Sequence, residues 1–403
     1  MLKYVKRKPL RRNKMITLLL ALMYLAFISL GLPDSMLGSA WPTMFVELDV
    51  PVSYAGIVSA IIALGTVVSS LASDRVTRKL GASKTTAISV TMTALALFGF
   101  AISTSFWHIC LFAIPYGLGA GSVDAALNNY VSLHFASRHM SWLHCMWGVG
   151  SAIGPAIMGA VLTNGASWKD GYFIVSGIQI IISMILFISL PIWKKPIQSN
   201  FAEHEVKNDK PLTLKQVITL KGARAVMITF FCYCSLEATT ILWASSYLNL
   251  FKGVDAETSA LWGSLYVLGI TIGRAISGFV TMKLNDIQMT RLGEGIMIVG
   301  FALLLLPLPN IFALIGLIIF GVGSAPIYPC IIHSTPERFG ADKSQALIGI
   351  QMASAYTGTC LMPTVFGLIA NHISIAYFPL YIAILTVVMI VMFEVFNKKT
   401  KAS

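Results

Sequence analysis

The stretch GLPDSMLGSAWP, residues 31–42, places an acidic residue, Asp34, inside an apolar run that begins near Met15. A carboxylate at the centre of a bilayer costs about 3 kcal/mol or more, so it normally marks a solute pathway, a proton site or a partner charge. The interpretation of Asp34 therefore depends on whether the chain lies in a membrane.

The composition is that of an integral membrane protein. Of the 403 residues, 56% are hydrophobic and only 11% are charged, whereas a soluble domain carries about 25% charged residues. Apolar runs long enough to cross a bilayer, about 20 residues each, recur along the whole chain. The sequence predicts an all-α protein with twelve transmembrane helices, near residues 15–44, 54–73, 85–104, 107–131, 143–163, 172–193, 223–250, 258–281, 293–308, 310–331, 345–370 and 374–395.

The net charge of +12 follows the membrane topology. If successive helices alternate sides, 26 of the 29 Lys and Arg residues lie in the segments on the N-terminal side, and only Lys169 and Lys252 lie in the opposite loops, with Arg274 inside a helix. The positive-inside rule then places both termini in the cytoplasm. We expect a multi-pass protein of the cell membrane that does not bind nucleic acid.

Other classes of function are disfavoured by the motifs. The first run is too long, and lacks the small-residue cleavage site, for a removable signal peptide. All six cysteines fall in predicted helices without a C-x-x-C pair, so we expect neither disulfides nor a metal cluster. The chain has no P-loop of the form G-x-x-x-x-G-K-[ST] and no nucleophile–base constellation. We therefore expect no cofactor and no enzyme activity, and ion-gradient coupling rather than ATP hydrolysis.

The chain divides into two similar halves. The long polar segment 194–222 is predicted as a cytoplasmic linker between a bundle at 15–193 and a bundle at 223–395, with basic cytoplasmic ends at 1–14 and 396–403. Within this linker, the residues after Pro211 are expected to form a short helix on the membrane surface.

The halves share motifs at an offset of six helices. The first and seventh helices each carry an acid about two turns before a tryptophan, GLGAG (117–121) matches GVG (321–323), and PAIMG (155–159) matches PTVFG (363–367). Paired six-helix halves around a central site are typical of secondary transporters.

Three acidic residues lie deep in the predicted helices and are the candidates for proton coupling: Asp34, Asp124 and Glu237. Burial favours the protonated form of a carboxyl group, and a second nearby carboxyl group favours it further. Two interpretations of Arg274 are open. In the first, Arg274 pairs with Glu237. In the second, Arg274 reaches the cytoplasmic interface, and its position near the inner end of its helix favours this second interpretation.

Aromatic, amide and imidazole side chains complete the candidate site. Sugars stack on aromatic rings and bond to amides and carboxylates, so the mixture favours a neutral polyhydroxylated solute, although about half of such residues are expected to serve helix packing. The candidate substrate-binding residues are Trp41, Asn128, Asn129, His144, Trp147, Trp243, Tyr247, Tyr328, Gln351 and Tyr356.

These motifs resemble the major facilitator superfamily, and within it the fucose permease-like sugar:proton symporters. SDRVTRKLG (73–81) is similar to the inner-loop motif of the superfamily, with Ser and Thr at two positions that are usually Gly. The resemblance implies alternating access, proton coupling and sugar binding at Asp34 and Asp124, and stabilisation of the outward-open state by Asp74 and Arg75. We group Asp74, Arg75, Arg78 and Arg274 as candidate gating residues.

The sequence thus predicts proton-coupled symport of a monosaccharide or similar small polar solute by a monomer in the bilayer. The alternative is a proton-antiport efflux carrier for drugs or metabolites on the same fold. A membrane receptor is disfavoured because the longest loop is too short for a signalling domain.

Overall fold

The computed structural model describes residues 9–34, 36–193 and 211–400, which are helical and contain no β-strand. The first half contains α1 (Pro9–Gly31), α2 (Met36–Glu47), η1 (Val52–Tyr54), α3 (Ala55–Ala101), α4 (Phe106–His134), α5 (Ser137–Thr163) and α6 (Trp168–Trp193). The second half contains α7 (Leu214–Thr219), α8 (Ala223–Leu250), α9 (Ala256–Val280), α10 (Asp286–Leu305), α11 (Asn310–Ser324), α12 (Ile327–His333), α13 (Thr335–Phe339), α14 (Ala341–Ile369), η2 (Ala370–Ser374), η3 (Ile375–Tyr377) and α15 (Phe378–Thr400).

All twelve predicted apolar runs fall in helices. Among the described residues, ten helical segments are long and apolar enough to cross a membrane, and two of them, 52–101 and 341–400, have the length of two crossings. The first of these turns at Gly81, whose φ of 78° is a conformation that favours glycine, and the second turns at η2 and η3. The chain is therefore a multi-pass membrane protein.

Prolines account for two breaks inside the predicted runs. Pro33 lies between α1 and α2, and Pro326 lies between α11 and α12. A proline has no N–H to donate and its ring clashes with the preceding turn, so it interrupts a helix. The first break ends α1 just before Asp34, and the second shortens the helix predicted at 310–331.

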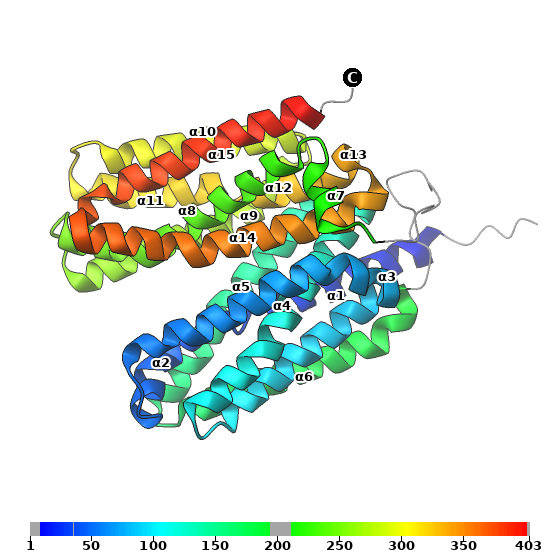
Figure 1. Cartoon of the computed structure of the whole chain (residues 1–403), viewed down its shortest axis with the longest axis horizontal. Coiled ribbons are helices and arrows are strands. Elements are labelled where there is room, and N and C mark those ends of the chain that lie inside the picture. Colours follow the sequence, from blue (N-terminus) through cyan, green and yellow to red (C-terminus); the bar gives the residue numbers. More distant parts are fainter. Residues whose placement is uncertain (1–8, 35, 194–210, 401–403) are drawn as a thin grey trace, which may run out of the picture.

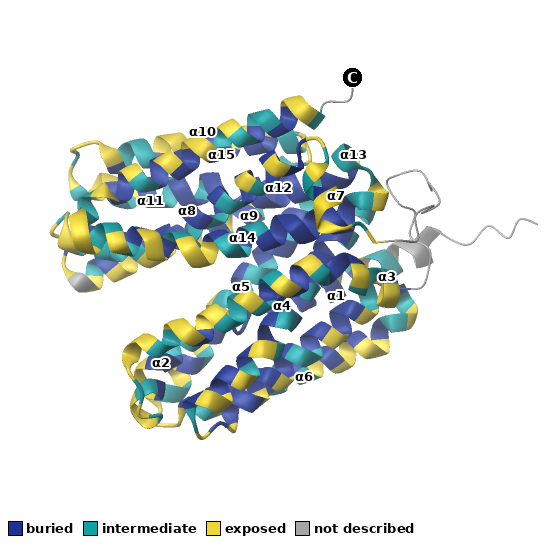
Figure 2. Cartoon of the chain, viewed as in Figure 1, coloured by how far each residue is buried: buried dark blue, intermediate teal, exposed yellow. Residues whose placement is uncertain are grey.

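The helices form two bundles that meet at one end (Figure 1). The first bundle contains α1–α6 and the second contains α8–α15, each with a buried interior and an exposed apolar outer surface (Figure 2). The short helix α7 lies in the segment where the sequence predicted one, and its N-terminus is closed by a capping box of Thr213 and Gln216. The rest of the predicted linker, at 194–210, lies outside the described residues, as do residues 1–8 and 401–403.

Close helix contacts repeat between the halves. A side chain at Gly150 of α5 would overlap the backbone of α1 at Ile28, and one at Gly358 of α14 would overlap the backbone of α8 at Phe231. In the same way, Gly121 holds α4 against α3, and Gly321 holds α11 against α9. Glycine lets helix backbones approach closely. The sequence repeat therefore corresponds to a repeated packing scheme.

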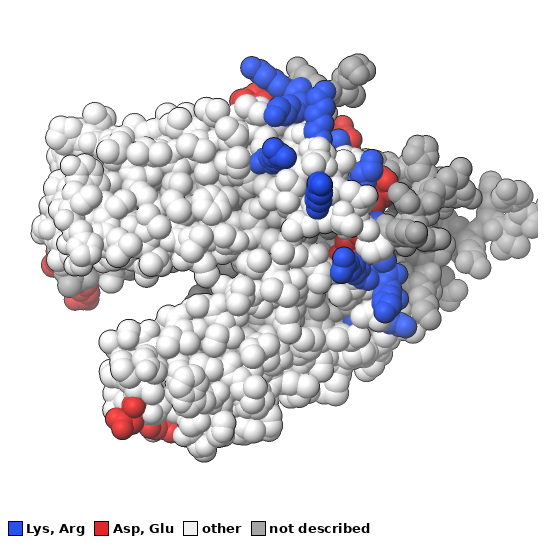
Figure 3. Space-filling model, in the orientation of Figure 1, with Lys and Arg blue, Asp and Glu red and all other residues white. Residues whose placement is uncertain are grey.

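The two bundles are closed at the end where the Lys and Arg side chains gather (Figure 3). We call this the basic end; it contains the turn at Gly81, the α4–α5 and α9–α10 connections, α13 and the end of α15. Here Ser344 of α14 donates to the Asn129 side chain of α4 at 2.6 Å, and Gln345 donates to the Ala125 carbonyl at 3.3 Å. A hollow between the bundles opens at the opposite end (Figure 3).

Candidate functional site

A cavity of about 580 Å³ lies between the two bundles. It is lined by residues of α1 to α6 on one side and of α8, α9, α12 and α14 on the other. The volume is that of a small-molecule site, which is typically 300–1,000 Å³. The three deep acids predicted from the sequence, Asp34, Asp124 and Glu237, all line this cavity.

Asp34 follows the proline break at the end of α1 and is exposed to the cavity. Its Oδ1 accepts a hydrogen bond from the Tyr116 hydroxyl at 3.1 Å, and its Oδ2 accepts one from the indole N–H of Trp147 at 2.7 Å. Both donors are uncharged. Among the described residues, Asp34 therefore has two uncharged hydrogen-bond donors and no ion-pair partner. Its carboxyl group can be reached from the cavity.

Asp124 lies deeper in the first bundle, on α4, and is only 4% exposed. Its Oδ1 accepts from the Asn128 amide at 2.8 Å, and its Oδ2 accepts from the Tyr356 hydroxyl of α14 at 2.7 Å. The Asn128 oxygen lies 3.0 Å from Nε2 of His144. The second carboxyl group is thus tied directly to the opposite bundle, and its neighbours form a hydrogen-bonded chain that ends at His144.

Arg274 lies at the cavity and not at the cytoplasmic interface, which corrects the interpretation that the sequence favoured. Its side chain is only 4% exposed, and its terminal nitrogen lies 3.6 Å from the Glu237 carboxylate on α8. Its guanidinium also stacks over the Trp147 ring of the first bundle, 5.4 Å from the ring centre. The cost of leaving a guanidinium unpaired in the membrane explains why the paired alternative is the one adopted.

Four of the ten candidate substrate-binding residues line the cavity: His144, Trp147, Tyr328 and Tyr356. Asn128 lies immediately behind this surface, between Asp124 and His144. Tyr116, an embedded aromatic outside the predicted set, also lines the cavity and bonds to Asp34.

The other five candidates face away from the cavity and hold helices together. The Trp41 indole donates to the Val52 carbonyl, that of Trp243 to Pro363, and the Tyr247 hydroxyl to Leu304. Asn129 bonds to Ser344 at the basic end, and Gln351 bonds to Thr335. A position inside a predicted helix indicates burial, but it does not indicate which neighbour satisfies the polar atom. These five residues are not among those that line the cavity, in keeping with the expectation that about half of the candidates serve helix packing.

The candidate gating residues lie at the basic end, apart from Arg274. Asp74 is buried and accepts from Arg78 at 2.9 Å, while Arg78 also donates to the Asp342 carbonyl of α14 at 3.0 Å. Arg75, by contrast, is exposed. The resemblance implied that Asp74 and Arg75 stabilise the outward-open state; in the structure Arg78, which is paired with Asp74, makes a contact between the bundles.

A second link at the basic end was missed by the sequence analysis. Asp286, at the start of α10, accepts from the Ser137 hydroxyl of α5, and its Oδ2 lies 2.6 Å from Nδ1 of His333. The other ring nitrogen of His333 lies 3.0 Å from the Phe135 carbonyl of the first bundle. These residues lie near the ends of predicted helices, so only the tertiary structure brings them together. Glu294 of α10, an acid that is buried like Asp74 and Asp124, was also missed.

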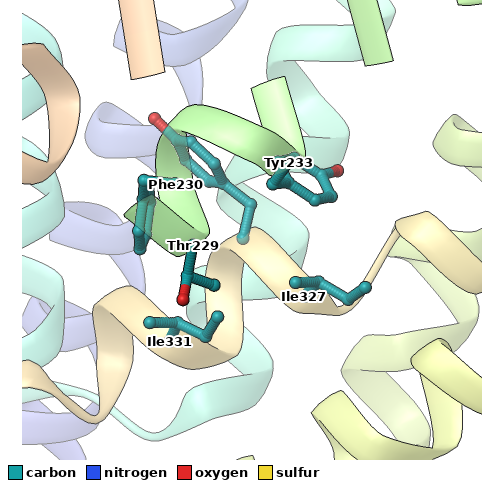
Figure 4. A pocket seen from close by; sticks show the side chains of 6 residues that line it. Thr229, Phe230, Tyr233, Ile327 and Ile331 are labelled. Carbon is teal, nitrogen blue, oxygen red and sulfur yellow. The ribbon is translucent and has the colours of Figure 1, made fainter. Parts of the chain in front are cut away.

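The contact between α8 and α12 leaves a small gap that is not a site (Figure 4). Thr229, Phe230 and Tyr233 face Ile327, Tyr328 and Ile331 across this gap, which has no room for a water molecule. It is a packing seam that supports Tyr328 at the floor of the cavity.

Comparison with known proteins agrees with this architecture. The model of the Major Facilitator Superfamily matches residues 23–350 and 228–402. The hexuronate transporter of Bacillus subtilis is 24% identical over 382 residues, which cover 87% of each chain. The fold is similar to that of the E. coli fucose:proton symporter, with a TM-score of 0.71, 14% identity, and 93% of this chain and 98% of that chain covered.

A proton:xylose symporter has a similar fold as well, with a TM-score of 0.78, 12% identity, and 95% of this chain and 96% of that chain covered. At these identities the structural likeness establishes the fold and not the solute. The family match spans nearly the whole sequence, from the first transmembrane helix to the end of α15. This chain therefore belongs to the major facilitator superfamily of transporters.

Proposed function

We propose that the chain carries a monosaccharide or a similar small polar solute together with protons, by alternating access. The observation that carries this proposal is the cavity with two carboxyl groups, each held by neutral donors. A carboxyl group with a fixed partner cation would stay ionised, whereas Asp34 and Asp124 have only hydroxyl, indole and amide donors among their described partners. Either group can gain and lose a proton as its surroundings change.

The lining of the cavity supports a polyhydroxylated solute. Trp147 and Tyr356 present aromatic surfaces beside carboxyl groups, and His144 adds a ring nitrogen. The solutes named for similar proteins, fucose, xylose and hexuronate, are all sugars or sugar acids. The movement we propose is rocking of the bundle at 15–193 against the bundle at 223–395, with the linker on the cytoplasmic side.

The closed basic end defines the state of the carrier. By the positive-inside rule this end faces the cytoplasm of a cell membrane, so both termini lie inside and the cavity opens outward. The contacts of Arg78 and Asp286 between the bundles hold this state until solute and protons are bound. We propose that a monomer is sufficient, because both bundles that line the cavity belong to the same chain.

The experiment that tests the proposal is uptake into proteoliposomes under an imposed inward proton gradient. We expect Asp34→Asn to abolish accumulation driven by the gradient while exchange of labelled for unlabelled solute continues. Full proton-driven uptake by this variant would refute the role of Asp34. Accumulation driven by an outward proton gradient in the wild type would favour the efflux carrier instead.

A further inference from the structure

Arg274 is the single Lys or Arg among the described residues that line the cavity. It is 3% exposed, and the small exposed part faces the cavity. Its Nε has no hydrogen-bond acceptor among the described residues. A guanidinium has five N–H donors in a planar fork, so an incompletely bonded, buried arginine at a solute cavity has unused capacity to bind an anion.

The contact with Glu237 does not use that capacity. A terminal nitrogen of Arg274 and a carboxylate oxygen of Glu237 are 3.6 Å apart, which is too far for a hydrogen bond. A charge-assisted hydrogen bond has a length of about 2.8 Å, and a carboxylate that fully engages an arginine makes two such bonds in parallel. In this same chain Arg291 and Glu394 form that two-bonded arrangement, with both distances at 2.8 Å. Glu237 thus neutralises the charge of Arg274 but leaves hydrogen-bond donors of the guanidinium unused.

The guanidinium also lies over the ring of Trp147. The ring centre lies 5.4 Å from the central carbon of the arginine, within the range of a cation–π contact. Because Trp147 also donates to Asp34, the arginine is positioned close to the carboxyl group that we propose for proton coupling. The fork is therefore fixed in place rather than free to swing into solvent.

We propose that Arg274 is an anion subsite, and that the solute is a sugar acid whose carboxylate bonds to the guanidinium fork while its hydroxyl groups face the aromatic and carboxyl side chains of the first bundle. Glu237 is the internal anion that neutralises Arg274 in the empty carrier. This inference rests on the proposed function, because it names the class of solute for the same cavity. It differs from the neutral solute that the sequence favoured, because that expectation rested on the mixture of aromatic, amide and carboxyl side chains and gave no weight to a single buried arginine.

The test compares two pairs of probes that differ only in the acid group: glucuronate with glucose, and galacturonate with galactose. Binding to the purified full chain in detergent is measured by titration calorimetry at fixed pH. We expect each uronate to bind at least tenfold more tightly than its hexose. In Arg274→Lys, which keeps the charge and loses the fork, we expect this ratio to fall by about tenfold.

A second variant separates loss of binding from loss of folding. Arg274→Gln alone leaves Glu237 buried without its cation, so the double variant Arg274→Gln/Glu237→Gln removes both charges together. We expect it to melt within a few degrees of the wild type and to bind uronate and hexose alike. Glu237→Gln alone removes the competing anion, and we expect it to bind uronate more tightly than the wild type does.

Equal affinity of the wild type for uronate and hexose would overturn the proposal, as would an unchanged preference in the double variant. These outcomes are distinct from failure of the proposed function. Proton-driven hexose uptake without uronate preference would leave the symporter standing and remove the anion subsite. Uronate preference that depends on Arg274, together with uptake that does not respond to a proton gradient, would support the anion subsite and refute proton coupling.

Discussion

The hydroxyl of Tyr356 in the second bundle lies 2.7 Å from the Oδ2 of Asp124 in the first. This bond joins the two bundles through a residue that we propose to change protonation state. A bond of this kind exists only while α4 and α14 are close together. Its strength also depends on charge, because a carboxylate accepts a hydrogen bond more strongly than a carboxylic acid does.

We predict that Tyr356→Phe weakens the closed basic end. A hydrogen bond to a charged group contributes about 1.5–3 kcal/mol, so its loss shifts the population of open and closed states by about tenfold or more. Distances between spin labels at the Gly81 turn of α3 and at the start of α14 should then include a longer component. The matched control is Tyr381→Phe, because that hydroxyl bonds to the Met362 carbonyl inside the second bundle. A similar lengthening in both variants would contradict the prediction.

We predict that Trp147→Phe moves the pH dependence of uptake. The change removes the indole donor to Asp34 but keeps an aromatic ring beneath Arg274. Loss of a donor to the ionised form makes protonation easier, so the pH of half-maximal uptake should rise, by up to about one unit, which corresponds to 1.4 kcal/mol. Trp243→Phe is the control, since its indole bonds to Pro363 away from the cavity. A shift to lower pH would contradict the assignment.

We predict that Asp286→Ala opens the basic end. Asp286 joins Ser137 of the first bundle to His333 of the second, and Cys330 is fully buried beside them. In a chain whose other cysteines are replaced by serine, a maleimide should label Cys330 at least about tenfold faster after this change, because two bonds to a charged group are lost.

The control for the labelling experiment is Glu394→Gln. This change breaks an ion pair with Arg291 that lies wholly within the second bundle. Its labelling rate should equal that of the unchanged chain. Equal labelling of the Asp286 variant and this control would show that the Asp286 link does not hold the bundles closed.

We predict that Gly154→Ala destabilises the first bundle. A Cβ there would overlap the Leu32 carbonyl, whereas a Cβ at Gly159, on the same helix, would meet nothing within 4 Å. Overpacking of this kind costs about 1–3 kcal/mol, so the melting temperature in detergent should fall by several degrees. Gly159→Ala should have the same melting temperature as the wild type. Equal melting of the two variants would mean that α1 and α5 separate easily.

The fold was predictable because the bilayer imposes a coarse pattern on the sequence. Twelve apolar runs, the distribution of Lys and Arg and the six-helix repeat can all be recognised along the sequence, and the runs coincide with helices of the structure. The acids were predictable for a related reason, since the cost of an acid in lipid leaves few roles for Asp34, Asp124 and Glu237.

The partners of individual polar residues were not predictable in the same way. Trp41 and Trp147 are both embedded tryptophans, yet one bonds to the Val52 carbonyl of η1 and the other to Asp34. Which of these occurs depends on helix rotation and on residues far away in the chain. Arg274 shows the same limit, because its depth was judged from its position along α9 and not from the neighbours that surround it.

The position of Trp147 between Asp34 and Arg274 has a spectroscopic consequence. Indole emission responds to nearby charge, and this indole touches an ionisable carboxyl group at one edge and a cation on its face. In a chain whose other tryptophans are replaced by phenylalanine, the emission wavelength of Trp147 would change when Asp34 gains a proton and again when the anionic group of a ligand binds the guanidinium. The fluorescence of Trp147 would thus report both protonation of Asp34 and binding of a ligand, without an attached dye.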